Sequence, residues 1–151
     1  MMKTSFKVVP DTTVLVASEK STSSTSPNKE FFYRWRNEEF ELLYSDNTLL
    51  EYIKKMREKG ISRESIKKLI RAVLKLGHKV HIVFYHFPHY PIDPDDIAFL
   101  LCAENGKATH IISYDKHLKD IDFLYSFKVC ETLDFLFELR KELSKLRETN
   151  Q

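Results

Sequence analysis

The sequence predicts an α/β fold of three layers, in which helices cover both faces of a central parallel sheet of about five strands. Two observations support this prediction. Short apolar runs alternate with longer amphipathic segments along the whole chain, which is typical of parallel strands joined by crossover helices. In addition, acidic residues directly follow two of the predicted strands, at the edge where open α/β sheets place their functional sites.

Length and composition indicate one globular domain over residues 1–151, with 42% apolar and 30% charged residues. A chain of this length buries roughly 70% of its extended-chain surface. No apolar run approaches the ~20 residues of a membrane span, and the N-terminus lacks a hydrophobic signal core, so we expect no membrane association and a cytoplasmic location. We expect Cys102 and Cys130 to be buried free thiols. The three glycines form no phosphate-binding cluster, which disfavours nicotinamide and P-loop enzymes.

The first half of the chain begins with a predicted strand over Phe6 to Pro10. We place the end of this strand at Pro10, because proline lacks an N–H donor and is tolerated there only as the last residue. The polar segment 18–26 is rich in Ser and Thr, and we expect a flexible loop there. Apolar periodicity and capping residues then predict a helix from Pro27, a strand over Phe40 to Tyr44, a helix from Ser45 or Asp46 to about Lys59, and a helix from Ser62 to Leu76.

The second half begins with a predicted third strand over Val80 to Tyr85. A helix over the apolar run Ile97 to Ala103 follows, with Pro94 in its first turn and Gly106 just past its end. This run leaves no polar face, so we expect the helix to be buried. The remaining predicted elements are a strand over Thr109 to Ser113, a strand over Lys128 to Cys130, a helix from Thr132 to Arg147, and a disordered tail over 148–151.

Four carboxylates are candidates for one site: Asp11, Glu51, Asp96 and Asp115. Two of them follow strands, one begins a helix, and one lies in the helix after the second strand. Unpaired carboxylates about 5 Å apart would repel by about 3 kcal/mol per pair at an effective dielectric near 20. Such a cluster needs a divalent cation, a shared proton or a nearby base. Oxygen ligands suit Mg²⁺ or Mn²⁺, and the chemistry of these ions fits phosphodiester hydrolysis.

Each carboxylate also has a purely structural explanation. Asp96 could cap its helix and favour the helix dipole. Glu51 lies four residues before Lys55 and could form a solvated ion pair. Asp11 and Asp115 could be turn residues that bond their own backbone.

The order and local context of these residues resemble PIN-domain nucleases. Four segments are similar to the four family motifs: Val8 to Val16 (VVPDTTVLV), Ser45 to Tyr52 (SDNTLLEY), Asp93 to Ala103 (DPDDIAFLLCA) and Ser113 to Leu118 (SYDKHL). The resemblance extends over Lys7 to Leu136. Its Asp-Pro-Asp-Asp and Asp-Lys-His-Leu segments are similar to the VapC-like toxin components of toxin–antitoxin pairs.

The resemblance implies a Mg²⁺- or Mn²⁺-dependent endoribonuclease that acts as a toxin, often forms a homodimer and is held inactive by a small antitoxin. The residues that it implies as metal ligands and catalytic groups are Asp11, Glu51, Asp96 and Asp115. We expect Thr13, Ser113 and Asp95 to support the same site, with Ser113 contributing a hydroxyl contact.

Two departures from the family pattern leave other functions open. Thr13 stands where the family usually has Asn, and Pro10 replaces a plain apolar strand residue. A catalytically inactive PIN-like module that binds RNA or a protein is therefore an alternative. An aspartyl phosphotransferase is another, because Asp11 and the residues after it resemble its nucleophile loop, although that loop normally carries a second Asp at position 13.

The segment 54–79 has ten Lys or Arg and two Glu. Within it, one helix face carries candidates for binding RNA phosphates, namely Lys67, Lys68, Arg71 and Lys75. An ordinary solvated helix face is the more usual explanation. The aromatic run at 31–35 cannot enter one core completely, so we expect at least one of its residues to be exposed. A dimer or antitoxin surface is our preferred interpretation, and ordinary core packing is an equal alternative for Phe31 and Trp35, which are four residues apart.

Overall fold

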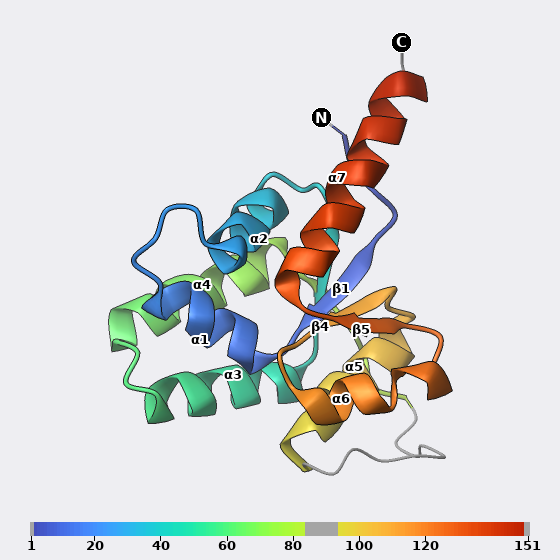
Figure 1. Ribbon diagram of the computed structural model, residues 1–151. Coiled ribbons are helices and arrows are strands. Elements are labelled where there is room, and N and C mark those ends of the chain that lie inside the picture. Colours follow the sequence, from blue (N-terminus) through green and yellow to red (C-terminus); the bar gives the residue numbers. More distant parts are fainter. Residues whose placement is uncertain (1, 84–93, 150–151) are drawn as a thin grey trace.

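The computed structural model describes residues 2–83 and 94–149 (Figure 1). The strands are β1 (Lys7–Pro10), β2 (Glu41–Tyr44), β3 (His78–Lys79), β4 (His110–Ile112) and β5 (Lys128–Cys130). The helices are α1 (Thr12–Lys20), α2 (Pro27–Arg36), α3 (Asp46–Glu58), α4 (Arg63–Leu76), α5 (Ile97–Gly106), α6 (Lys116–Asp120) and α7 (Thr132–Thr149). Two 3₁₀ turns, η1 (Pro94–Asp96) and η2 (Asp122–Leu124), complete the description.

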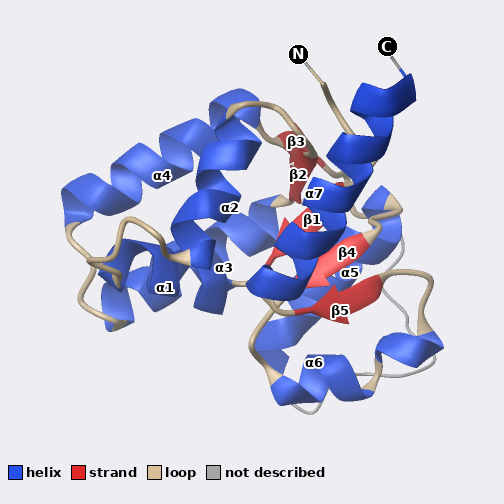
Figure 2. Cartoon of the chain, turned by 45° about the horizontal axis from the view of Figure 1, so that its top comes forward, coloured by secondary structure: helices blue, strands red, loops and turns tan. Residues whose placement is uncertain are grey.

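The five strands form one parallel sheet in the order β3-β2-β1-β4-β5, which confirms the predicted fold class. Figures 1 and 2 show α7 in front of the sheet and α5 behind it. Because the sheet is parallel, the strands end at one common edge. Asp11, Ser45 and Ser113 directly follow β1, β2 and β4, so these residues come together at that edge.

The aromatic residues of α2 belong mainly to the core between α2, α7 and the sheet. The ring of Phe31 lies 5.0 Å from that of Phe40 and 5.7 Å from that of Phe135. Phe32 and Trp35 are also buried, whereas Tyr33 is 66% exposed. Tyr33 confirms the prediction of at least one exposed aromatic, and the alternative of core packing is confirmed for Phe31 and Trp35. The preferred interpretation as a dimer or antitoxin surface is wrong for the three rings that fill this chain's own core.

Several predicted boundaries and one strand differ from the structure, and helices α1 and α6 were not predicted. Ser18 to Lys20 continue α1, and α7 reaches Thr149, so both the predicted loop and the predicted tail are shorter than expected. The third strand is His78–Lys79 rather than Val80 to Tyr85. Its partner β2 ends where Ser45 caps α3, and among the described residues 80–83 the pairing continues with one bond, from the N–H of Val80 to the carbonyl of Tyr44 at 2.7 Å. Residues 84–85 and Asp93 lie outside the described residues.

The buried helix α5 differs from its prediction at the C-terminus. The residue in the left-handed conformation is Lys107, with φ 53°, and Gly106 is the last helical residue. A Cβ on Gly106 would lie 2.7 Å from Val80 Cγ2 and 2.9 Å from Leu43 Cδ1. Gly106 is therefore explained by close packing rather than by a turn.

The predicted burial of α5 is confirmed for residues 99–103, and Cys102 and Cys130 are buried and free. In 2–83 and 94–149, no helix is apolar over a length that could span a membrane.

Gly77→Ala is expected to destabilise the protein by about 2 kcal/mol, because overpacking a close contact typically costs 1–3 kcal/mol. An added Cβ would lie 2.5 Å from the backbone oxygen of Val73 and 2.9 Å from Cδ1 of Tyr44. Urea unfolding of the variant measures this loss. Gly77 is the C-cap of α4, and Lys68 is exposed on that helix. The stability of Lys68→Ala should therefore stay within about 0.5 kcal/mol of the parent. A similar small effect for Gly77→Ala would contradict the prediction.

Candidate active site

The structure brings the four predicted carboxylates to one pocket of about 390 Å³ at the carboxyl edge of the sheet. They come from four separate segments: the end of β1, α3, η1 and the start of α6. The residues that line the pocket are Asp11, Thr12, Thr13, Val16, Ala17, Glu51, Lys55, Lys59, Asp95, Asp96, Phe99 and Asp115.

Asp11 is the N-cap of α1 and is almost completely buried, at 3% exposure. Its Oδ1 accepts hydrogen bonds from the backbone N–H of Thr13 at 2.9 Å and from the Thr13 hydroxyl. Its Oδ2 accepts from the hydroxyl of Ser113, whose oxygen in turn accepts the backbone N–H of Asp115 at 2.8 Å. Thr13 and Ser113 therefore orient Asp11 from both sides.

Burial raises the pKa of Asp11 to about 6, although the hydrogen bonds from Ser113 and Thr13 oppose the shift; the charge of Asp115 raises it further. The dominant cause is the desolvation of the charged form. A cation in the pocket would act in the opposite direction, because it would stabilise the carboxylate.

Asp96 and Asp115 form a hydrogen-bonded carboxyl pair, which needs one proton between the two groups. Burial raises the pKa of Asp115, but the hydrogen bond with Asp96, the backbone N–H of His117 and the charge of His117 outweigh it and lower that pKa overall. Asp96 is 6% exposed and makes no side-chain cap bond to α5. Asp96 therefore holds the N-cap position of α5 without the predicted side-chain bond, whereas the side chains of Asp11 and Asp115 do cap α1 and α6.

Glu51 Oε2 is buried and has no hydrogen-bond partner among the residues that the structure describes. The predicted solvated pair with Lys55 is not observed, because Lys55 Nζ instead lies 2.8 Å from the carboxylate of Asp95 and 3.7 Å from that of Glu58. The ion pair with Asp95 raises the pKa of Lys55 and lowers the pKa of Asp95. A buried carboxylate oxygen without a described partner, on a residue that lines the same pocket as Asp11, Asp96 and Asp115, is a group that a hard cation would satisfy.

Within residues 2–83 and 94–149, no group of three or more His, Cys, Asp or Glu side chains is already arranged closely enough to hold an ion. The donor set nevertheless fits Mg²⁺ or Mn²⁺, since it consists of carboxylate oxygens. Mg²⁺ usually keeps several of its waters and takes only one or two carboxylates directly. Carboxylates that line one pocket can therefore share such an ion through water.

Comparison with protein families decides the relationship: residues 7–117 match the PIN domain. The chain belongs to the PIN-domain family. No curated protein matches it. Among solved structures, its fold is similar to that of Mycobacterium tuberculosis VapC20, described as a toxin that cleaves the sarcin-ricin loop, with a TM-score of 0.55 and 10% identity over 80% of this chain and 98% of that one.

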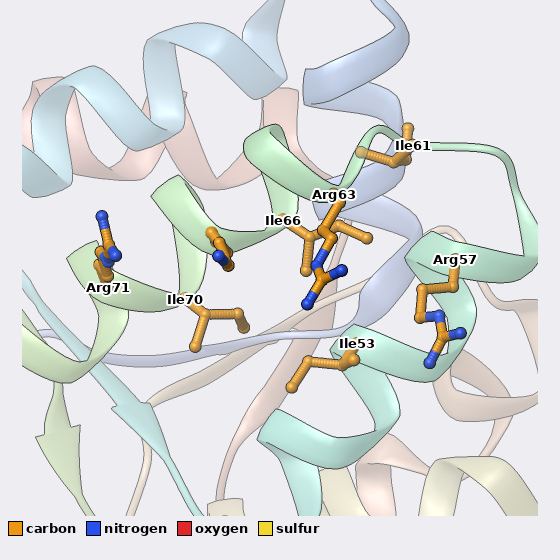
Figure 3. Close-up of a pocket in the computed structure, with 8 residues that line it drawn as sticks. Ile53, Arg57, Ile61, Arg63, Ile66, Ile70 and Arg71 are labelled. Carbon is orange, nitrogen blue, oxygen red and sulfur yellow. The ribbon is translucent and has the colours of Figure 1, made fainter.

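The predicted RNA contacts of this PIN domain lie apart from the acidic pocket. Lys67, Lys68, Arg71 and Lys75 are exposed on α4, and none of them lines that pocket. Lys67 and Arg71 line a second pocket of about 710 Å³ between α3 and α4 (Figure 3). Its other lining residues are Ile53, Arg57, Ile61, Arg63, Ile66 and Ile70.

The sequence analysis missed Lys59 and the apolar wall formed by Val16, Ala17 and Phe99. A signal for Lys59 was present, because Glu51, Lys55 and Lys59 are spaced four residues apart and share one helix face. The sequence carries no comparable signal for the apolar wall. An apolar residue of α1 gives the same sequence pattern whether it faces the core or a pocket.

Proposed function

We propose that this PIN domain is a Mg²⁺- or Mn²⁺-dependent endoribonuclease that hydrolyses phosphodiester bonds of RNA. The observation that supports this function most is the pocket shared by Asp11, Glu51, Asp96 and Asp115, which no single structural role explains. Membership of a family of nucleases supports the reaction class.

In this proposal, the four carboxylates hold one or two ions, and a bound ion supplies an activated water and stabilises charge on the phosphoryl group. Ser113 and Thr13 orient Asp11. Asp95 supports the site indirectly, because its ion pair with Lys55 holds that lysine at the pocket.

Cleavage of a fluorescent single-stranded RNA tests the proposal directly. We expect the purified protein to cut the RNA internally with Mn²⁺ or Mg²⁺ and to lose this activity in excess chelator. Cleavage that persists in chelator, or that Asp96→Asn purified in the same way retains, would exclude the proposed mechanism.

The proposed physiological role is that of the toxin component of a toxin–antitoxin pair. The fold is similar to that of VapC20, and the match extends over 98% of the VapC20 chain, which supports this role. Induced expression in a bacterial host should arrest growth for the parent and not for Asp96→Asn. Equal growth of the two strains would count against a toxin. The small antitoxin, the homodimer and the cytoplasmic location remain predictions, and light scattering of the purified protein tests the homodimer.

A catalytically inactive PIN module is the second candidate, because of Thr13 and Pro10. The contacts of Thr13 weigh against it, because the hydroxyl and backbone N–H of Thr13 both donate to Asp11. RNA binding without cleavage in Mn²⁺ would favour this candidate. An aspartyl phosphotransferase is disfavoured, because Thr13 stands where its nucleophile loop normally carries a second Asp.

Thr13→Val is expected to reduce the cleavage rate by about 10-fold or more, since losing a residue that orients a metal ligand typically costs 10- to 100-fold. Valine keeps the shape of threonine but cannot donate to Asp11. Thr13→Ser keeps the hydroxyl and should remain within about threefold of the parent. Single-turnover cleavage and Mn²⁺ titration measure both variants, and equal rates for the two would show that the hydroxyl is unimportant.

A further inference from the structure

Two lysines extend the acidic pocket along α3. Glu51, Lys55 and Lys59 share one face of this helix and all line the pocket. At 1.5 Å per residue, Lys59 lies roughly 12 Å along the helix axis from Glu51. Because α3 starts at the carboxyl edge of the sheet with the Ser45 cap, Lys59 lies at the end of the pocket that is farther from the sheet.

The two lysines differ in their ion pairs. Lys55 forms ion pairs with Asp95 and Glu58, at 2.8 and 3.7 Å. Lys59 is exposed, and its ammonium group forms no ion pair with any residue in 2–83 or 94–149. The backbone N–H of Lys59 donates to the carbonyl of Lys55 at 3.0 Å, which fixes the start of the Lys59 side chain at the end of α3.

The wall between the carboxylates and Lys59 is apolar. Val16 and Ala17 of α1 are half-buried and line this part of the pocket together with Phe99 of α5. Helix α1 packs against α3 (Figure 1). Along α3, the pocket therefore passes from the carboxylates near the sheet edge to Lys55, which is paired with Asp95, and then to Lys59, with apolar residues of α1 and α5 in its lining. A nucleic acid strand offers matching groups, because its charged phosphates alternate with bases and sugars.

We propose that Lys59 binds a backbone phosphate of the RNA strand other than the scissile one, so that the strand lies in the hollow between α1 and α3. The proposal rests on the proposed function, because the scissile phosphate is placed at the carboxylates. A cation beyond the acidic end gives a polyanion a second fixed point, and phosphate contacts of this kind set the register of a strand without reading its sequence. This subsite places the RNA on α3 rather than on the exposed face of α4.

Equilibrium binding of a labelled single-stranded RNA of about 12 nucleotides, with Ca²⁺ in place of Mg²⁺ and the RNA checked for integrity, tests the subsite. We expect Lys59→Ala to weaken binding about fivefold to tenfold and to reduce the slope of log K against log salt by about 0.7. Lys59→Arg should restore both. Lys54→Ala removes the same charge from an exposed position on the same helix that does not line the pocket, and it should stay within about twofold of the parent.

A length series distinguishes a phosphate subsite from a general charge effect. A dinucleotide has one phosphodiester and cannot reach Lys59 while it occupies the carboxylates, so its binding should be unchanged in Lys59→Ala. Equal weakening by Lys59→Ala and Lys54→Ala, equal weakening for the dinucleotide and the longer RNA, or no RNA binding by the parent would each overturn the subsite. A melting temperature within about 2 °C of the parent excludes a purely structural effect at the end of α3.

The two proposals fail separately. Binding in Ca²⁺ needs no turnover, so a parent protein that binds RNA through Lys59 but does not cut it in Mn²⁺ would support the phosphate contact and overturn the nuclease. A parent that cuts RNA while Lys59→Ala and Lys54→Ala behave alike would keep the nuclease and overturn the subsite.

Discussion

Asp96→Asn is expected to lower the rate of Mn²⁺-dependent RNA cleavage by at least about 10³-fold, which corresponds to roughly 4 kcal/mol in the activation free energy. Asp96 is buried in the pocket and hydrogen-bonded to Asp115. The substitution removes one negative charge and hardly changes the shape of the side chain. The loss should therefore appear in catalysis and metal affinity rather than in folding.

Single-turnover cleavage measures the effect, and Mn²⁺ titration of each variant reports whether the ion still binds. Asp134→Asn is a matched control, because Asp134 is exposed in the first turn of α7 and does not line the pocket. Its rate should equal that of the parent. If Asp96→Asn keeps more than about a tenth of the parental rate, Asp96 is not a metal ligand of the reaction.

Metal-free protein is expected to lose up to about 3 kcal/mol of stability as the pH rises, because burial raises the pKa of Asp11 from 3.8 to about 6. The folded state favours the protonated carboxyl, so this contribution is fully present below pH 4 and is lost as the pH rises through about 6. Asp11→Asn stays neutral. In chelator, the stability of this variant relative to the parent should therefore increase by about 1.5 kcal/mol between about pH 5 and pH 8.

Urea unfolding of both proteins at a series of pH values measures this difference, in which the other titrating groups largely cancel. Saturating Mn²⁺ at pH 8 should stabilise the parent by about 2.7 kcal/mol at 100 times Kd and should stabilise Asp11→Asn far less. A stability difference that does not change with pH would mean that Asp11 is not desolvated as the geometry indicates.

Most of the secondary structure was predictable because its signals are local. Ser45 and Ser62 cap α3 and α4, as expected for a hydroxyl that accepts the N–H three residues later. Pro27 opens α2, and the apolar run of α5 is buried. The third strand was misplaced because a strand needs a partner, and the end of β2 at Tyr44 determines where pairing stops.

The candidate site was predictable in part. The spacing of Asp11 and Asp115 after strands indicated a common edge, and the structure places both there with Asp96 and Glu51. The exact use of each oxygen was not predictable. Thr13 stands where the family usually has Asn, yet it still donates to Asp11. Glu51 Oε2 is buried without a partner among the described residues. Both features are consequences of how α1 and α3 pack.

The sequence by itself determined the alternation of strands and helices, because each element depends on neighbours a few positions away, and this alternation indicated a parallel sheet. The resemblance to PIN domains indicated the acidic residues. Only the tertiary structure decided which rings of α2 are buried, why Gly106 has no side chain, and that Lys59 rather than α4 extends the acidic pocket. These features depend on contacts between segments far apart in the chain, such as the hydrogen bond from Ser113 to Asp11, which are 102 residues apart. Packing of the whole chain sets such contacts, and no local pattern encodes them.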